Sequence, residues 1–168
     1  MIEARTEANT RFFTAEAERI AELSLRLAER FLAGGRLLAV GASAQDRSDA
    51  HHVAVEFVHP VIVGKRALPA LALHPDQVGL LAEPGDALIA FGTQARAPRG
   101  CLTIGFDADT EGWAFEPPSD DPFVRQELVE TLYHVLWETV HVFLDHLGSS
   151  HSGAGGSAFL YPFLEHTE

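Results

Sequence analysis

The chain has 168 residues, of which 46% are hydrophobic and 21% are charged. This length and balance predict a single globular domain with a sizeable core, and they exclude a disordered protein. The formal net charge of -12 argues against polyanionic partners, so we expect neither nucleic acid nor a membrane as a partner. No stretch has the length of a membrane span or the pattern of a signal peptide. Because Cys101 is the only cysteine, no internal disulfide is possible, and a cytoplasmic location is expected.

The first part of the chain predicts a helix, a buried strand and a second helix. Apolar residues recur at helical spacing over residues 7–33, and Gly34 then ends this helix. The apolar run 36–41 predicts a strand that closes on a glycine. A turn of small residues follows, and a second helix is expected at about residues 48–58. This order of elements is typical of a turn that binds an anion, although no glycine follows Gly41 in the turn.

Four further strands are predicted from short apolar runs, at residues 67–73, 87–91, 102–106 and 113–115. The segment between the first two of them is expected to be irregular or briefly helical. Strands that alternate with helices predict an α/β three-layer sandwich, with a mostly parallel sheet flanked by helices. Only residues 92–100 separate two of these strands, which is too short for a helical crossover. Either this join is a loop, or the two strands are not parallel neighbours.

The longest periodic segment, residues 122–147, predicts a helix with one broad apolar face. Its other face carries no lysine or arginine and comprises Gln126, Glu127, Glu130, His134, Glu138, His141 and Asp145. Solvated helix faces usually interleave both signs of charge, because like charges one turn apart repel. Two interpretations remain open: an acidic solvated face, or a stripe that holds a cation or a reacting group.

A second polar stripe lies on the helix expected at residues 48–58. Asp49, His52, Glu56 and His59 are spaced to share one face of that helix. The side chains of His52 and Glu56 are one turn apart, so they can converge on one cation or one substrate oxygen. The alternative is an ordinary surface pair of a histidine and a glutamate.

The end of the chain has a different composition from the rest. Residues 148–158 form a glycine and serine linker, and residues 159–164 form an apolar, aromatic hexamer. We therefore expect one α/β domain over residues 1–147 and a linker with a tail over residues 148–168. The hexamer is expected to dock on its own domain or on a neighbouring subunit, or to bind a protein partner.

Taken together, several segments resemble the phosphoheptose isomerase branch of the sugar isomerase (SIS) domains. The resemblance runs in order from about residue 12 to residue 147, through residues 35–41, 48–57, 68–73, 85–90 and 125–134. It implies a SIS-type sheet and a homo-oligomer, either a tetramer or a dimer, with sites shared between subunits. It also implies the aldose–ketose isomerisation of a seven-carbon sugar phosphate through an enediol.

The resemblance implies a divalent metal site, with Zn²⁺ favoured and iron or nickel still open. The implied ligands are His52, Glu56, Gln126 and His134. Glu56 is the implied base near C2 of the sugar and His134 the implied acid near the carbonyl oxygen. Further candidates on the last helix are Glu130, Glu138 and His141.

The chain departs from this family where phosphate is expected to bind. The loop after the first strand is residues 42–46, and its Asp46 places an acid beside the expected anion. The loop after residues 87–91 is short, so the sheet is expected to lack one crossover helix. The remaining candidates for substrate binding are Ser43, Asp49, Thr93 and Arg96.

Three hypotheses follow from these observations. The first is a metal-dependent isomerase of a phosphosugar with an altered phosphate pocket. The second is a non-catalytic SIS-fold protein that binds a metal or a partner as an accessory factor, for example in the maturation of a metalloenzyme such as hydrogenase. The third is a plain structural role, with every histidine on a solvated face.

Overall fold

A five-stranded sheet forms the centre of the computed structural model, which describes residues 2–94, 96–108 and 110–149. All strand pairs are parallel, in the order β2-β1-β3-β4-β5. The strands are β1 (Leu37–Gly41), β2 (Ala70–Leu73), β3 (Ala87–Phe91), β4 (Leu102–Phe106) and β5 (Trp113–Phe115). Every residue of β1 and β3 is buried, as expected for central strands of a parallel sheet with both faces covered. The predicted α/β class with a parallel sheet is therefore confirmed.

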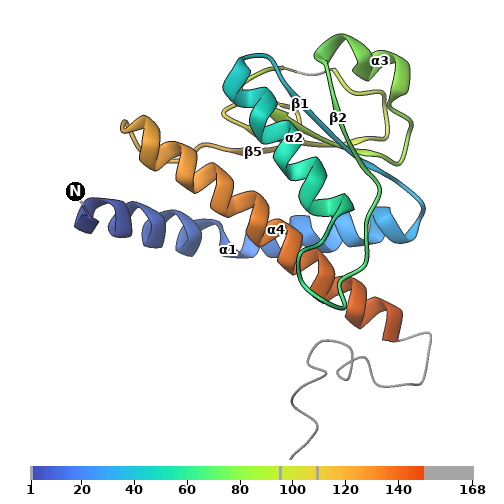
Figure 1. Cartoon of the computed structure of the whole chain (residues 1–168), viewed down its shortest axis with the longest axis horizontal. Coiled ribbons are helices and arrows are strands. Elements are labelled where there is room, and N and C mark those ends of the chain that lie inside the picture. Colours follow the sequence, from blue (N-terminus) through green and yellow to red (C-terminus); the bar gives the residue numbers. More distant parts are fainter. Residues whose placement is uncertain (1, 95, 109, 150–168) are drawn as a thin grey trace, which may run out of the picture.

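The two faces of the sheet are covered unequally. Three long helices, α1 (Ile2–Leu32), α2 (Ala44–Val58) and α4 (Pro122–Ser149), share the larger core with one face. Among the described residues, the other face carries the short elements η1 (Pro75–Gln77) and α3 (Val78–Leu81) together with loops. Figure 1 shows α2 crossing in front of the sheet, with α4 and α1 below it. The third layer of the predicted sandwich is thus reduced to two short, consecutive helical segments.

The connection between β3 and β4 resolves the alternative that the sequence left open. Residues 92–101 join two parallel neighbours, and the described part of this connection, residues 92–94 and 96–101, contains no helix. Ala97 and Ala108 from this loop and the next pack on the smaller core, where a crossover helix would otherwise lie. The expected loss of one crossover helix is therefore present in the structure.

Two element boundaries differ from the sequence expectation for identifiable reasons. Helix α2 begins at Ala44 instead of residue 48, because Ser43 and Asp46 form a reciprocal capping box at its N-terminus. Strand β2 begins at Ala70 instead of residue 67. Pro69 has no N–H for the ladder, and the N–H of Leu68 donates to the carbonyl of Phe57 instead.

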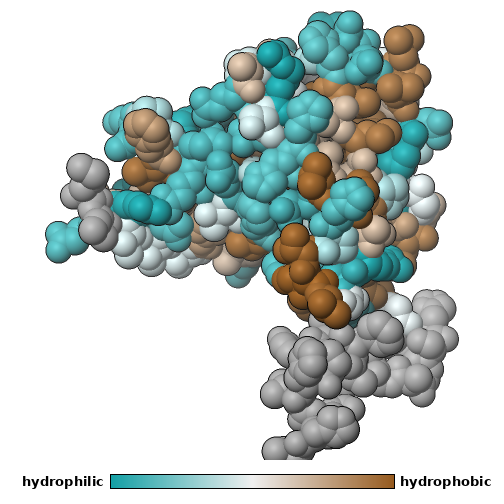
Figure 2. Space-filling view, in the orientation of Figure 1, coloured by the Kyte–Doolittle hydropathy of each residue, from teal (hydrophilic) through white to brown (hydrophobic). Residues whose placement is uncertain are grey.

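The surface seen in Figure 2 is largely hydrophilic over α2 and α4. An apolar patch interrupts it at the loop after α2, where Val61, Ile62 and Val63 are exposed. Within the described ranges, no helix is both long and apolar enough to cross a membrane. Helix α4 continues to Ser149, so the first two residues of the predicted linker are helical. The rest of the linker and the apolar hexamer at residues 159–164 lie outside the described residues.

Candidate functional site

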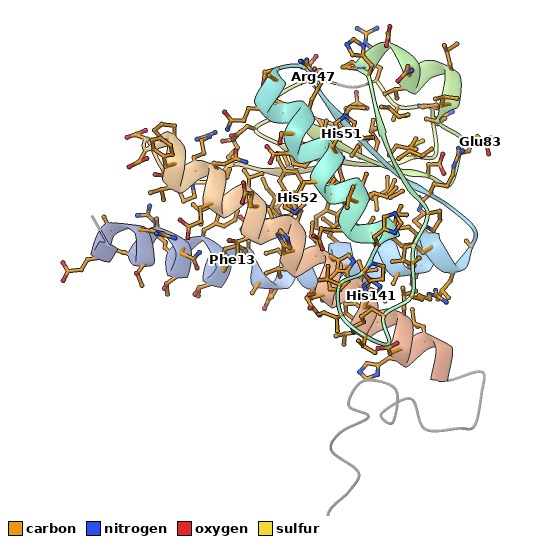
Figure 3. All side chains as sticks on the ribbon, viewed as in Figure 1. Phe13, Arg47, His51, His52, Glu83 and His141 are labelled. Carbon is orange, nitrogen blue, oxygen red and sulfur yellow. The ribbon has the colours of Figure 1, made fainter. Side chains whose placement is uncertain are left out.

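Three of the four predicted metal ligands come together between α2 and α4. The ligand atoms of His52, Glu56 and His134 all lie within 4.8 Å of one another. Nε2 of His52 is 3.4 Å from Oε1 of Glu56, and Nε2 of His134 is 4.0 Å from the same oxygen. The two imidazole rings meet edge to face, with centroids 5.2 Å apart. Figure 3 shows His52 between α2 and α4.

The orientation of α2 on the sheet determines where these side chains point. Val53 and Phe57 are fully buried against the sheet, so the turn-related residues His52 and Glu56 are turned toward α4. The side chain of Glu56 is 16% exposed, whereas those of His52 and His134 are 44% and 42% exposed. The carboxylate therefore lies at the base of the group, and the two imidazoles form its open rim.

The tautomer of His134 suits a metal ligand. Its Nδ1 lies 2.7 Å from the backbone carbonyl of Glu130. A carbonyl oxygen can only accept, so Nδ1–H must donate this hydrogen bond. In the neutral ring Nε2 then keeps its lone pair, and this atom faces Glu56. Such a backbone partner on one ring nitrogen is the usual way in which a ligating histidine is oriented.

Tyr133 contacts both imidazoles and was not singled out from the sequence. Its ring is fully buried, and its hydroxyl lies 3.0 Å from Nδ1 of His52. Its ring centroid is 5.4 Å from that of His52 and 4.8 Å from that of His134. Burial raises the pKa of Tyr133 well above its ordinary value, and the charges of nearby carboxylates raise it further, so the hydroxyl keeps its proton.

Gln126 lies next to this group with its amide fully engaged. Its Nε2 donates to Oδ1 of Asp49 at 2.8 Å and to Oε1 of Glu130 at 3.0 Å. Its Oε1 accepts from Nε2 of Gln45 at 2.7 Å. Because ionised carboxylates only accept, they draw the NH₂ group toward themselves. The oxygen expected to bind a metal is instead directed at Gln45.

Asp49 is the most buried carboxylate of this region, with 6% of the residue exposed. Burial raises its pKa, and Glu130 and Asp46 raise it further, while the hydrogen bond from Gln126 and the charge of His52 lower it. The net direction is upward. Asp49 lies one helical turn before His52 on α2 and also lines a neighbouring pocket.

A pocket of ≈ 110 Å³ opens at the carboxyl ends of β3 and β4. Its single cationic side chain, Arg125, is paired with Asp107 through two hydrogen bonds. Two further carboxylates, Asp46 and Asp49, have no cation beside them in this lining. The pocket is therefore acidic. It is lined by Gln45, Asp46, Asp49, Phe91, Gly92, Phe106, Asp107, Pro122, Arg125, Gln126 and Val129.

The predicted substrate-binding residues other than Asp49 do not line this pocket. Ser43 caps α2: its Oγ accepts from the N–H of Asp46 at 3.1 Å, and its own N–H donates to Oδ2 of Asp46 at 3.0 Å. The hydroxyl is thus committed to the helix end. Thr93 and Arg96 lie in the loop after β3, with Arg96 exposed, and neither lines the pocket.

The remaining candidates on α4 fall into different environments. Glu130 is half-buried and accepts from Gln126, and Glu138 is exposed. His141 was grouped with the polar face of this helix, and whether that face is solvated was left open; the residue is buried, with 2% exposed. Its Nδ1 faces the carbonyl of Trp137 and its Nε2 faces that of Arg66, in the segment before β2. That segment covers the end of α4, so burial extends further around the helix than its apolar stripe indicates.

Comparison with known proteins places the chain in a family. No family model matches it. A phosphoheptose isomerase of Roseiflexus sp. is 30% identical, over 83% of this chain and 89% of the relative. One from Solidesulfovibrio magneticus is 29% identical, over 85% and 87%. The solved structure of a phosphoheptose isomerase from Francisella tularensis superposes with a TM-score of 0.70 at 17% identity, over 84% of this chain and 94% of that one. The one from Neisseria gonorrhoeae superposes with a TM-score of 0.69 at 16% identity, over 84% of this chain and 95% of that one.

The solved structures define the class of fold, a SIS-type α/β domain. The sequence relatives show the family as well as the fold: the chain belongs to the phosphoheptose isomerase family. The resemblance drawn from the sequence is therefore confirmed. The donor set is consistent with a metal centre, because two imidazoles and a carboxylate, one imidazole with its lone pair already free, form a ligand set that suits Zn²⁺.

Proposed function

We propose that this chain is an aldose–ketose isomerase of the phosphoheptose isomerase type, acting on a sugar phosphate through an enediol. The observation that carries the proposal is the convergence of His52, Glu56 and His134 from two helices far apart in the sequence. Family membership supports the reaction class, and the three side chains supply groups that can bind a cation and move a proton.

The proposed metal ligands are His52, Glu56 and His134. A divalent cation held by them, with Zn²⁺ favoured, would supply Lewis-acid polarisation of the substrate oxygens next to the carbon that loses its proton. Gln126 is a proposed fourth ligand only if its amide turns away from Gln45, since its oxygen now accepts from that side chain. In the present arrangement Gln126 instead holds Asp49 and Glu130 in place.

Glu56 is the proposed base. Its Oε1 faces both imidazoles, which leaves Oε2 to move the proton between the two carbons, from C2 to C1 when an aldose becomes a ketose and from C1 to C2 in the reverse direction. The proposed roles of His134 as ligand and as acid exclude each other. Its Nδ1–H is held by Glu130, so Nε2 is the one atom that can either bind a cation or transfer a proton.

The acidic pocket beside the group is the proposed seat for part of the sugar. Hydroxyl groups of the sugar can donate to the carboxylate of Asp49, which lines the pocket. A phosphate dianion is poorly matched to Asp46 and to an arginine already paired with Asp107. We therefore assign the phosphate to the exposed Arg96 in the loop after β3. The site is proposed to be completed in a homo-oligomer, as the resemblance implies.

The same acidic pocket favours one alternative function. A SIS-fold protein that has lost its phosphate site retains its cation ligands and can serve as a metal-binding accessory protein. The two functions share the ligand group, and they differ in whether a sugar phosphate is turned over.

Incubation of the Zn²⁺-loaded protein with sedoheptulose 7-phosphate tests the proposal. We expect an aldose product that disappears in Glu56→Gln and persists in Glu138→Gln, a matched change at an exposed site on α4. Cation binding without product would replace the isomerase by the accessory function. Neither cation binding nor product would remove both.

A further inference from the structure

We infer that Tyr133 is a positioning residue for the metal ligand His52, an inference that rests on the proposed metal site. The two imidazoles of the site are held differently. Nδ1 of His134 faces a backbone carbonyl, whereas Nδ1 of His52 faces the phenol hydroxyl of Tyr133 at 3.0 Å. Because of this difference, His52 can adopt either tautomer, whereas the carbonyl fixes that of His134.

The chemistry of the two partners explains why the difference matters. A carbonyl fixes one tautomer, because it can only accept a hydrogen bond. A hydroxyl can donate or accept. When it donates to Nδ1 of His52, Nε2 carries the proton and faces Oε1 of Glu56 at 3.4 Å. When it accepts from Nδ1–H, Nε2 presents a lone pair to a cation, and the proton has moved from one ring nitrogen to the other.

The surroundings hold the tyrosine firmly while leaving His52 open. Tyr133 is fully buried, and its ring packs edge to face on Phe91 with centroids 6.1 Å apart. The side chain of His52 is 44% exposed, so without the hydroxyl its Nδ1 can turn to water. Loss of the hydroxyl should therefore change the orientation and tautomer of His52 and leave the packing of the ring intact.

The test compares Zn²⁺ affinity in the full chain, by competition with a chromophoric chelator, for wild type, Tyr133→Phe and Thr139→Val. The last variant is the control, since it removes a hydroxyl of α4 that donates only to the carbonyl of Val135. We expect Tyr133→Phe to weaken Zn²⁺ binding about tenfold, in the range typical for partners that orient ligands. Its metal-free melting temperature and the affinity of Thr139→Val should stay near wild type.

A spectroscopic measurement tests the tautomer of His52 directly. In long-range ¹H–¹⁵N spectra of the wild type, Zn²⁺ should leave Nδ1 of His52 as an N–H nitrogen, as the inference requires, and an unprotonated Nδ1 would refute the inference even if Tyr133→Phe does not fold. Zn²⁺ affinity of Tyr133→Phe within twofold of wild type, or an unprotonated Nδ1 in the Zn²⁺ form, would overturn the inference and leave the proposed function standing. Absence of Zn²⁺ binding by the wild type would overturn both.

Discussion

The carboxylate of Asp46, in the first turn of α2, lies against the backbone of Gly92, the residue that follows β3. A Cβ on Gly92 would stand 2.8 Å from Oδ1 and 2.9 Å from Oδ2 of Asp46. The N–H of Ser43 donates to the same carboxylate at 3.0 Å. A helix N-terminus of this kind favours an external anion. In this chain the carboxylate of Asp46 takes the place of an external anion at the N-terminus of α2.

Neutralising Asp46 should therefore improve the binding of phosphate. Asp46→Asn keeps a cap for α2 and removes a negative charge from the pocket lining. We expect inorganic phosphate to bind about tenfold more tightly, because repulsion between charges a few ångströms apart is worth about 1–4 kcal/mol. Isothermal titration calorimetry measures the change. Asp76→Asn, an exposed charge in η1, is the control, and equal gains in both variants would argue against a local effect.

Gly92 should tolerate no side chain while Asp46 is present. Its φ of +56° is disfavoured for other residues, and the contact with Asp46 adds to that cost. We expect Gly92→Ala to lower the free energy of unfolding by about 1–2 kcal/mol in urea denaturation. Gly79→Ala, where a Cβ meets nothing within 4 Å, should be near neutral. Combining Gly92→Ala with Asp46→Ser should recover part of the loss, and strict additivity of the two changes would show that the residues do not interact.

Asp86, which immediately precedes β3 at the amino ends of the strands, should control acid stability. Its burial raises its pKa, but the hydrogen bonds from Arg36 and from two backbone amides lower it more, so the net pKa lies below the ordinary 3.8. A lowered pKa contributes stability above about pH 4 that is lost as the pH falls through the folded-state value. Asp86→Asn should cost about 2–3 kcal/mol at pH 7 and should flatten the acid limb below pH 4.

The control for Asp86 is Glu83→Gln, which changes the exposed partner of the same arginine at 3.9 Å. Such an exposed pair contributes little, so its free energy of unfolding should stay within about 0.5 kcal/mol of wild type. Urea denaturation as a function of pH measures both variants. An Asp86→Asn protein with an unchanged acid limb would show that another carboxylate controls it.

Sequence reasoning predicted the elements whose signals are local. The continuous apolar runs at residues 37–41 and 87–91 identified the central strands, and one-turn spacing placed His52 beside Glu56 on one face of α2. The approach of His134 required the family resemblance as well, because no local pattern specifies which helices cross.

The misses depend on contacts between distant segments. His141 lies in a polar stripe of the sequence. The segment around Arg66 folds over it, and the carbonyl of Arg66 forms a hydrogen bond with its Nε2. Gln126 turns its amide toward two carboxylates, and one of them, Asp49, comes from another helix. Tyr133 has the ordinary position of a core aromatic on α4. The one sequence signal was its hydroxyl, because the hydroxyl of a buried tyrosine usually has a hydrogen-bond partner.

The measurement that tests the central claim most directly is metal analysis of the purified protein together with Zn²⁺ titration of three histidine variants. We expect one divalent cation per chain in the wild type, loss of binding in His52→Ala and His134→Ala, and wild-type binding in His51→Ala, which removes the exposed neighbour of His52. A protein that binds no cation, or whose affinity is unchanged by removing either His52 or His134, would contradict the account.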